Sequence, residues 1–149
     1  MARDYPDRPW VGVGVVVWRG DKLLLVRRGR PPRQGDWGIP GGAQDLGETI
    51  FDAARREVLE ETGVTIDPVA IVTVVDSIST DESGRVQFHY ALVEVCAEWM
   101  AGDAVAGSDA TDVRWVTPQE AANLVPWGET LRVIAEAARM RRTRDGGSD

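Results

Sequence analysis

Two apolar runs joined by a tight turn constrain the fold of this chain more than any other feature. Residues 11–18 read VGVGVVVW and residues 22–28 read KLLLVRR, with Gly20 and Asp21 between them. Runs rich in β-branched and aliphatic residues favour extended backbone, and a short glycine-containing connection is typical of a hairpin. We therefore predict that two antiparallel strands begin a sheet.

The rest of the chain alternates between strand-like and helix-like segments. Runs rich in Val, Ile and aromatic residues predict further strands at 66–77, 85–98 and 111–116. Apolar spacing and capping residues predict helices at 49–62, after Thr117 and at about 130–142. Loop residues are expected at 29–36, followed by a turn at Pro40-Gly41-Gly42.

This order of elements predicts an α/β fold, in which helices cover both faces of a mixed central sheet. The 149 residues fit one domain, with a frayed tail at 145–149. The composition, 43% hydrophobic and 28% charged, excludes disordered and fibrous classes. Arg139, Arg141 and Arg142 are interpreted as charges that favour the C-terminal end of the last helix dipole.

The charge balance and the single cysteine narrow the class of partner and the compartment. A net charge of −7 disfavours a nucleic-acid polymer as partner. Cys96 cannot form an internal disulfide, and no run approaches about 18 apolar residues or resembles a signal peptide, so we expect a cytoplasmic protein without a membrane partner. The sequence is silent on oligomeric state, and a homodimer stays open.

Three acids near the end of the predicted helix at 49–62 require compensation. Glu57, Glu60 and Glu61 are spaced i, i+3 and i+4, so they share one side of the helix, at the flank of its apolar stripe. Like charges at this spacing are unfavourable, and the C-terminal end of a helix is the wrong end for anions. Either Arg55 and Arg56 pair with them on a solvated face, or a divalent cation such as Mg²⁺ binds between them.

The residues around these acids decide between the two readings, because they match one pattern without exception. Its fixed positions are Gly42, Glu48, Arg56, Glu57, Val58, Glu60, Glu61, Gly63 and Val64. This spacing is similar to the box of the Nudix hydrolase family, and the flanking Trp37-Gly38-Ile39-Pro40-Gly41-Gly42 also resembles that family. The resemblance implies an α/β/α sandwich, which agrees with the predicted order of elements.

The resemblance also implies the roles of the box residues. Glu57, Glu60 and Glu61 would bind Mg²⁺, with Mn²⁺ as a substitute, and the carbonyl of Gly41 would be a further ligand. Arg56 would orient these carboxylates. The supporting positions would be Gly42, Glu48 and Gly63, with Glu48 either near a second metal ion or bonded to Arg56.

Outside the box, the resemblance implies substrate contacts and leaves the general base open. Arg28 would contact a substrate phosphate through its planar donors. An aromatic residue would stack on the base, and the tryptophans considered for this are Trp37, Trp10 and Trp18. The general base is either a box glutamate, such as Glu57 or Glu60, or an acid outside it. The outside candidates are Glu94, Glu98, Asp109 and Asp112, of which Asp109 is favoured.

The implied activity is hydrolysis of the diphosphate of a small nucleotide derivative. Finer resemblance to small bacterial ADP-ribose pyrophosphatases favours cleavage of ADP-ribose to AMP and ribose 5-phosphate, at a site where Mg²⁺ offsets the charge of acids and phosphates. A house-cleaning hydrolase of oxidised nucleoside triphosphates is the alternative. A catalytically silent nucleotide-sensing module is a third, and it predicts an eroded box, whereas every box glutamate is present.

Overall fold

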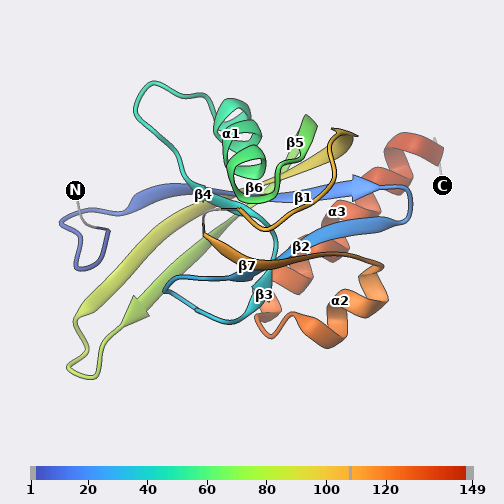
Figure 1. Cartoon of the computed structure of the whole chain (residues 1–149). Coiled ribbons are helices and arrows are strands. Elements are labelled where there is room, and N and C mark those ends of the chain that lie inside the picture. Colours follow the sequence, from blue (N-terminus) through green and yellow to red (C-terminus); the bar gives the residue numbers. More distant parts are fainter. Residues whose placement is uncertain (1–2, 108, 147–149) are drawn as a thin grey trace.

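A single mixed sheet carries helices on both of its faces (Figure 1). The computed structural model describes residues 3–107 and 109–146. Its strands are β1 (Trp10–Arg19), β2 (Lys22–Arg28), β3 (Trp37–Gly38), β4 (Gly41–Ala43), β5 (Thr65–Thr80), β6 (Val86–Ala101) and β7 (Ala110–Val116). Its helices are α1 (Ile50–Thr62), α2 (Pro118–Leu124) and α3 (Gly128–Gly146).

The first strand, β1, organises the sheet because it pairs with three others. The strand order is β3-β2-β1-β6-β5, with β4 paired to β1 and β7 paired to β2. The predicted hairpin is confirmed by the antiparallel pairing of Trp18 with Leu23. Along its other edge β1 runs parallel to β6, from Trp10 beside Tyr90 to Trp18 beside Glu98. The sheet is therefore mixed, as predicted.

Alternate residues of β1 contribute to two hydrophobic cores, one on each face of the sheet. Val15 and Val17 pack with Val58 of α1, whereas Val16 belongs to the core that includes Ile134 of α3. This alternation is the two-residue repeat of a strand that is buried on both sides. The predicted α/β/α sandwich is confirmed. None of the helices in the described ranges has the length and apolar character to cross a bilayer.

Two predicted boundaries are wrong. Gly41 and Gly42, expected in a turn, lie in β4 and pair with Gly14 and Val13 of β1, because glycines allow the two backbones to approach closely. The last helix extends from Gly128 to Gly146, so the first two residues of the predicted tail are helical. Residues 147–149 of that tail lie outside the described part of the chain.

The interpretation of the α3 arginines as charges at the helix end is also wrong for Arg139 and Arg141, which form ion pairs instead. Arg141 donates hydrogen bonds to the Glu98 carboxylate of β6 at 2.8 and 3.0 Å and to the Gly20 carbonyl at 2.7 Å. Arg139 pairs with Glu136 one turn earlier in the same helix. Because α3 continues beyond both residues, their charges bind neighbouring groups, and Arg141 ties the helix to the sheet.

Candidate active site

The helix that carries the acidic cluster, α1, ends where its sequence predicts. The Thr49 hydroxyl accepts a hydrogen bond from the Asp52 amide at 3.1 Å, and Gly63 terminates the helix with a φ of 74°. Ala54 and Val58 are fully buried against the sheet. Since this face fixes the rotation of α1, the acids that lie about 100° around the helix are held at the margin of that core.

Strand β4 runs close to these acids because it contains two glycines. A side chain at Gly41 would overlap the Val13 carbonyl of β1, and one at Gly42 would overlap the carboxylate of Glu57. The Gly41 amide donates a hydrogen bond to Oε1 of Glu61 at 3.1 Å. The glycine pair therefore lets the backbone of β4 contact two of the predicted metal ligands directly.

Arg56 is the centre of an ion-pair network that orders the box. Its Nε and Nη2 donate to the two oxygens of Glu48 at 2.6 and 2.9 Å, and Nη2 also donates to the Ala43 carbonyl at 2.9 Å. Its Nη1 donates to Glu57 at 2.8 Å and to Glu60 at 3.2 Å. The Arg56 hydrogen bonds hold the pKa of Glu48 below its usual value. Of the two roles predicted for Glu48, the bond to Arg56 is the one observed.

Glu57 and Glu61 are carboxylates in surroundings that disfavour their charge. Burial raises the pKa of Glu61 to about 7, and the nearby charge of Glu57 adds to this effect. Burial also raises the pKa of Glu57, against the opposing influence of Arg56. A cation between two such groups would stabilise both ionised forms, which is the electrostatic condition for a metal site.

The donor set suits a hard divalent ion. Carboxylate oxygens of Glu57 and Glu61 lie beside the backbone of Gly41, and Mg²⁺ usually takes one or two carboxylates while it keeps several waters. The side chain of Glu60 is 53% exposed and pairs with Arg56. Within residues 3–107 and 109–146, no three acidic, histidine or cysteine side chains converge around one point. Glu57 and Glu61 therefore form the nucleus of the candidate site, and Glu60 lies at its outer side.

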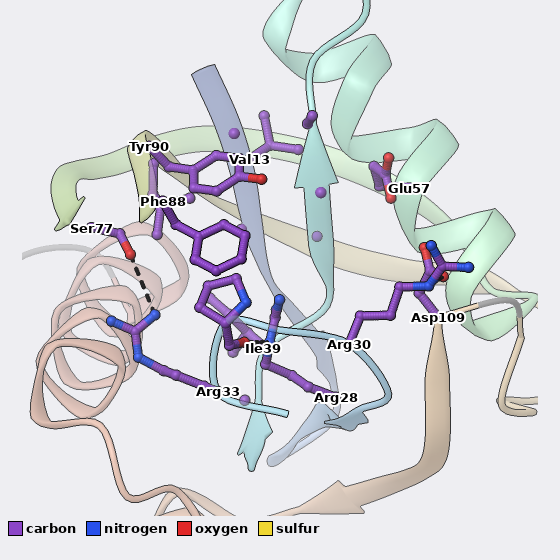
Figure 2. A pocket seen from close by; sticks show the side chains of 18 of the residues that line it. Val13, Arg28, Arg30, Arg33, Ile39, Glu57, Ser77, Phe88, Tyr90 and Asp109 are labelled. Atoms are coloured by element: carbon purple, nitrogen blue, oxygen red, sulfur yellow. Dashed lines mark hydrogen bonds and ion pairs between the residues drawn. The ribbon is translucent and has the colours of Figure 1, made fainter. Parts of the chain in front are cut away.

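A cavity of about 790 Å³ opens in front of these acids, and its opposite wall is basic. Arg28 and Arg30 come from the end of β2 and the loop after it (Figure 2). Nε of Arg28 donates to the Pro32 carbonyl at 2.7 Å, and Arg30 pairs with Asp109 at 2.7 Å. The predicted substrate-binding Arg28 and the favoured base Asp109 thus line the same cavity as the box acids.

The far end of the cavity is aromatic. Phe88 and Tyr90 of β6 lie there, grouped with Ile39 and apart from Glu57 and Asp109 (Figure 2). Trp127, just before α3, adds a further ring, and the guanidinium of Arg33 stacks 3.6 Å above it. Nη1 of Arg33 also donates to the Ser77 hydroxyl at 3.3 Å. The cavity therefore joins an end of charged groups to an end suited to a planar apolar group.

The tryptophans considered for stacking lie in different places. Trp37 lines the cavity and packs against the core on the α2 and α3 side. Trp18 is only 3% exposed and belongs to that core, so its use for stacking is excluded. The sequence does not predict Trp127 as a site residue. Its only local signal is its position in the short connection between α2 and α3.

The candidate general bases outside the box lie in different parts of the structure. Glu94 and Asp109 line the cavity. Glu98 instead pairs with Arg141 and Arg144 near the end of α3, and Asp112 is exposed on β7. The burial of Glu94 had one sequence signal, its position between two valines in a strand.

Comparison with known proteins agrees with this geometry. The family model of the NUDIX domain matches residues 8–137. The chain is 31% identical over 107 residues to an ADP-ribose pyrophosphatase of Methanocaldococcus jannaschii, a match that covers 72% of this chain and 61% of that protein. It is 34% identical over 65 residues to the 8-oxo-dGDP phosphatase NUDT18 of Mus musculus, covering 44% of this chain and 20% of that one.

A solved structure shares the whole architecture. The MutT NUDIX hydrolase of Burkholderia pseudomallei superposes with a TM-score of 0.72 at 26% identity, covering 87% of this chain and 98% of that one. The family match extends from β1 to α3, so it includes the box and the strands around the cavity. On these grounds the chain belongs to the Nudix family of hydrolases.

Proposed function

We propose that this chain hydrolyses the diphosphate linkage of a nucleoside diphosphate derivative with the help of Mg²⁺, and that ADP-ribose is its first substrate. One observation carries the proposal: the buried Glu61 and the half-buried Glu57 face arginines across a single cavity that continues into an aromatic pocket. A diphosphate fits between acids that bind a cation and arginines that bind phosphate oxygens, while the pocket accepts a nucleobase.

The metal would be held by carboxylate oxygens of Glu57 and Glu61 and by the carbonyl of Gly41, with Glu60 supplying a further carboxylate at the outer side. When bound, Mg²⁺ neutralises phosphate charge and lowers the pKa of a water molecule, and Mn²⁺ supplies the same chemistry. Arg56 keeps Glu57 in position through its 2.8 Å hydrogen bond, so that the carboxylate does not need to reorganise.

Arg28 and Arg30 would bind the substrate's phosphates from the opposite wall. A guanidinium presents paired N–H donors that match phosphate oxygens, and two such groups would orient the diphosphate for in-line attack. Both residues line the cavity, and both are held by a partner at 2.7 Å, the Pro32 carbonyl for Arg28 and Asp109 for Arg30. Positioning of the phosphates would therefore depend on residues 28–33.

Asp109 is the proposed general base. It lines the cavity, and its Oδ1 is oriented by Arg30, so the carboxylate is placed to accept the proton of an attacking water. Glu60 is the alternative within the box. Asp109→Asn and Glu60→Gln separate the two, because loss of the base lowers kcat with little effect on KM and steepens the dependence of the rate on hydroxide.

The substrate is tested by a kinetic panel with purified protein and Mg²⁺. The archaeal relative named ADP-ribose pyrophosphatase supports ADP-ribose, and the mouse relative named 8-oxo-dGDP phosphatase supports an oxidised nucleotide as the second candidate. We expect ADP-ribose to have the highest kcat/KM. Much faster turnover of 8-oxo-dGTP would exclude ADP-ribose as the first substrate, and binding of ADP-ribose without turnover of any compound would favour a silent sensing module.

A further inference from the structure

Glu94 lies in the same cavity as the box acids but on the other face of the sheet. It pairs with Gly14 of β1. Its neighbours at i−2 and i+2, Leu92 and Cys96, belong to the side covered by α2 and α3, whereas Val93 packs on the α1 side. Glu94 therefore points away from the face that carries α1 and its acids, and it has a role separate from theirs.

The carboxyl group of Glu94 is held in a built recess. Its side chain is 4% exposed, and its oxygens lie 2.6 and 2.9 Å from the position that a Cβ of Gly14 would take. The missing side chain of Gly14 thus provides the space for this carboxyl. Burial raises the pKa of Glu94 to about 7, and neither a hydrogen bond nor a charge from the described residues contributes to the shift.

The Glu94 carboxyl lies at the wall of the cavity and has no hydrogen-bond partner among the described residues, so a molecule in the cavity must satisfy it. Beside the polar Arg33, Ser77 and Thr130, the residues that line the cavity on this face include five aromatic or apolar ones from β6, the segment between β3 and β4, and the connection before α3. They are Phe88, Tyr90, Leu92, Ile39 and Trp127. Such walls favour a planar heterocycle, and one carboxyl among them can bond to the heterocycle's polar edge.

We propose that Glu94 recognises the adenine of the substrate by two hydrogen bonds, one donated to N1 and one accepted from the 6-amino group. This inference rests on the proposed function, because it assigns the base of that substrate. An uncharged carboxyl carries a donor and an acceptor side by side, which match this edge of adenine. Guanine's two adjacent donors, N1–H and the 2-amino group, match the ionised form, which burial of the carboxyl disfavours.

The test is isothermal titration of AMP, GMP and ribose 5-phosphate into the full chain with Mg²⁺. Glu94→Leu removes the hydrogen bonds, and we expect it to weaken AMP binding about 10-fold to 100-fold while ribose 5-phosphate binding is unchanged. Glu94→Gln restores a donor and an acceptor, so it should recover AMP affinity. Cys96→Ala, two residues along on the same face, is the matched control, and thermal melts verify that each variant folds.

The outcomes distinguish this inference from the proposed function. AMP affinity in Glu94→Leu equal to that of Cys96→Ala would overturn the inference, even if the wild type hydrolyses ADP-ribose. A large fall in kcat with unchanged AMP affinity would overturn it too, since Glu94 would then act on the reaction. So would tighter binding of GMP than AMP by the wild type. Glu94-dependent AMP binding in a protein that hydrolyses nothing would support the inference and remove the proposed function.

Discussion

Replacing Gly42 by alanine should lower the catalytic rate and leave the fold intact, because the added methyl group meets a side-chain carboxylate. A Cβ at this position would lie 2.6 Å from Oε1 of Glu57, whereas ordinary contacts begin at 3.4 Å. The carboxylate must therefore retreat by about 1 Å, and a misplacement of that size at a reacting centre costs about 100-fold in rate. Because the Glu57 carboxylate ends a flexible side chain, the pairing of β4 with β1 should persist.

We expect Gly42→Ala to lower kcat/KM for ADP-ribose about 100-fold and to raise the Mg²⁺ concentration required for half-maximal rate, with a melting temperature close to that of the wild type. Initial rates of AMP release across a Mg²⁺ titration measure the first two quantities. Gly38→Ala is the control, since a Cβ there meets nothing within 4 Å. If Gly42→Ala and Gly38→Ala have equal rates, the position of Glu57 does not matter for the reaction and the metal assignment is refuted.

Three further predictions concern ionisable side chains that line or order the candidate site. Glu61→Gln should lower kcat by about 1000-fold or more in steady-state assays while denaturant titrations show no loss of stability, and near-normal turnover would contradict its role as a ligand. Because burial raises the folded-state pKa of Glu94 to about 7 from an ordinary 4.5, its contribution to stability is fully present below pH 4.5 and is lost as the pH rises through about 7. The test is the difference in unfolding free energy between Glu94→Gln and the wild type, measured by urea titration. From about pH 4 to about pH 8 this difference should change by about 3 kcal/mol in favour of Glu94→Gln. A difference that stays constant with pH would exclude the burial of this carboxyl. Arg56→Lys keeps the charge but loses the paired bonds to Glu48, so the unfolding free energy should fall by about 2 kcal/mol, and an unchanged denaturation midpoint would show that the pairing is dispensable.

The features that the sequence predicts correctly are those set by neighbours along the chain. The capping Thr49 and the terminating Gly63 fix α1 within one residue, and Thr117 with Glu120 forms the expected reciprocal cap of α2. The spacing of the box acids likewise determines which of them share a side of the helix. Each of these outcomes depends on hydrogen bonds or geometry within about one helical turn, so the local sequence is sufficient.

The features that the sequence does not predict depend on register between distant strands. Gly14 and Glu94 meet because β1 and β6 pair in parallel, and nothing within either segment specifies that alignment. The local sequence predicts a turn at Gly41, and only its pairing with Gly14 of β1 makes it a strand residue. Arg33 and Trp127 stack although 94 positions separate them, and only the packed structure brings the loop after β2 against the start of α3.

The division of β1 between two partners has a consequence for how such an enzyme changes specificity. β4 pairs with the first part of β1 and β2 with its last two residues, so the sheet parts between them and a ligand can extend from one side of it to the other. The residues proposed to select the base and the acids proposed to cleave the diphosphate consequently lie on different faces of the sheet. Under these proposals, substitutions on the α3 side would change which nucleotide binds and leave the acids beside α1 unaltered.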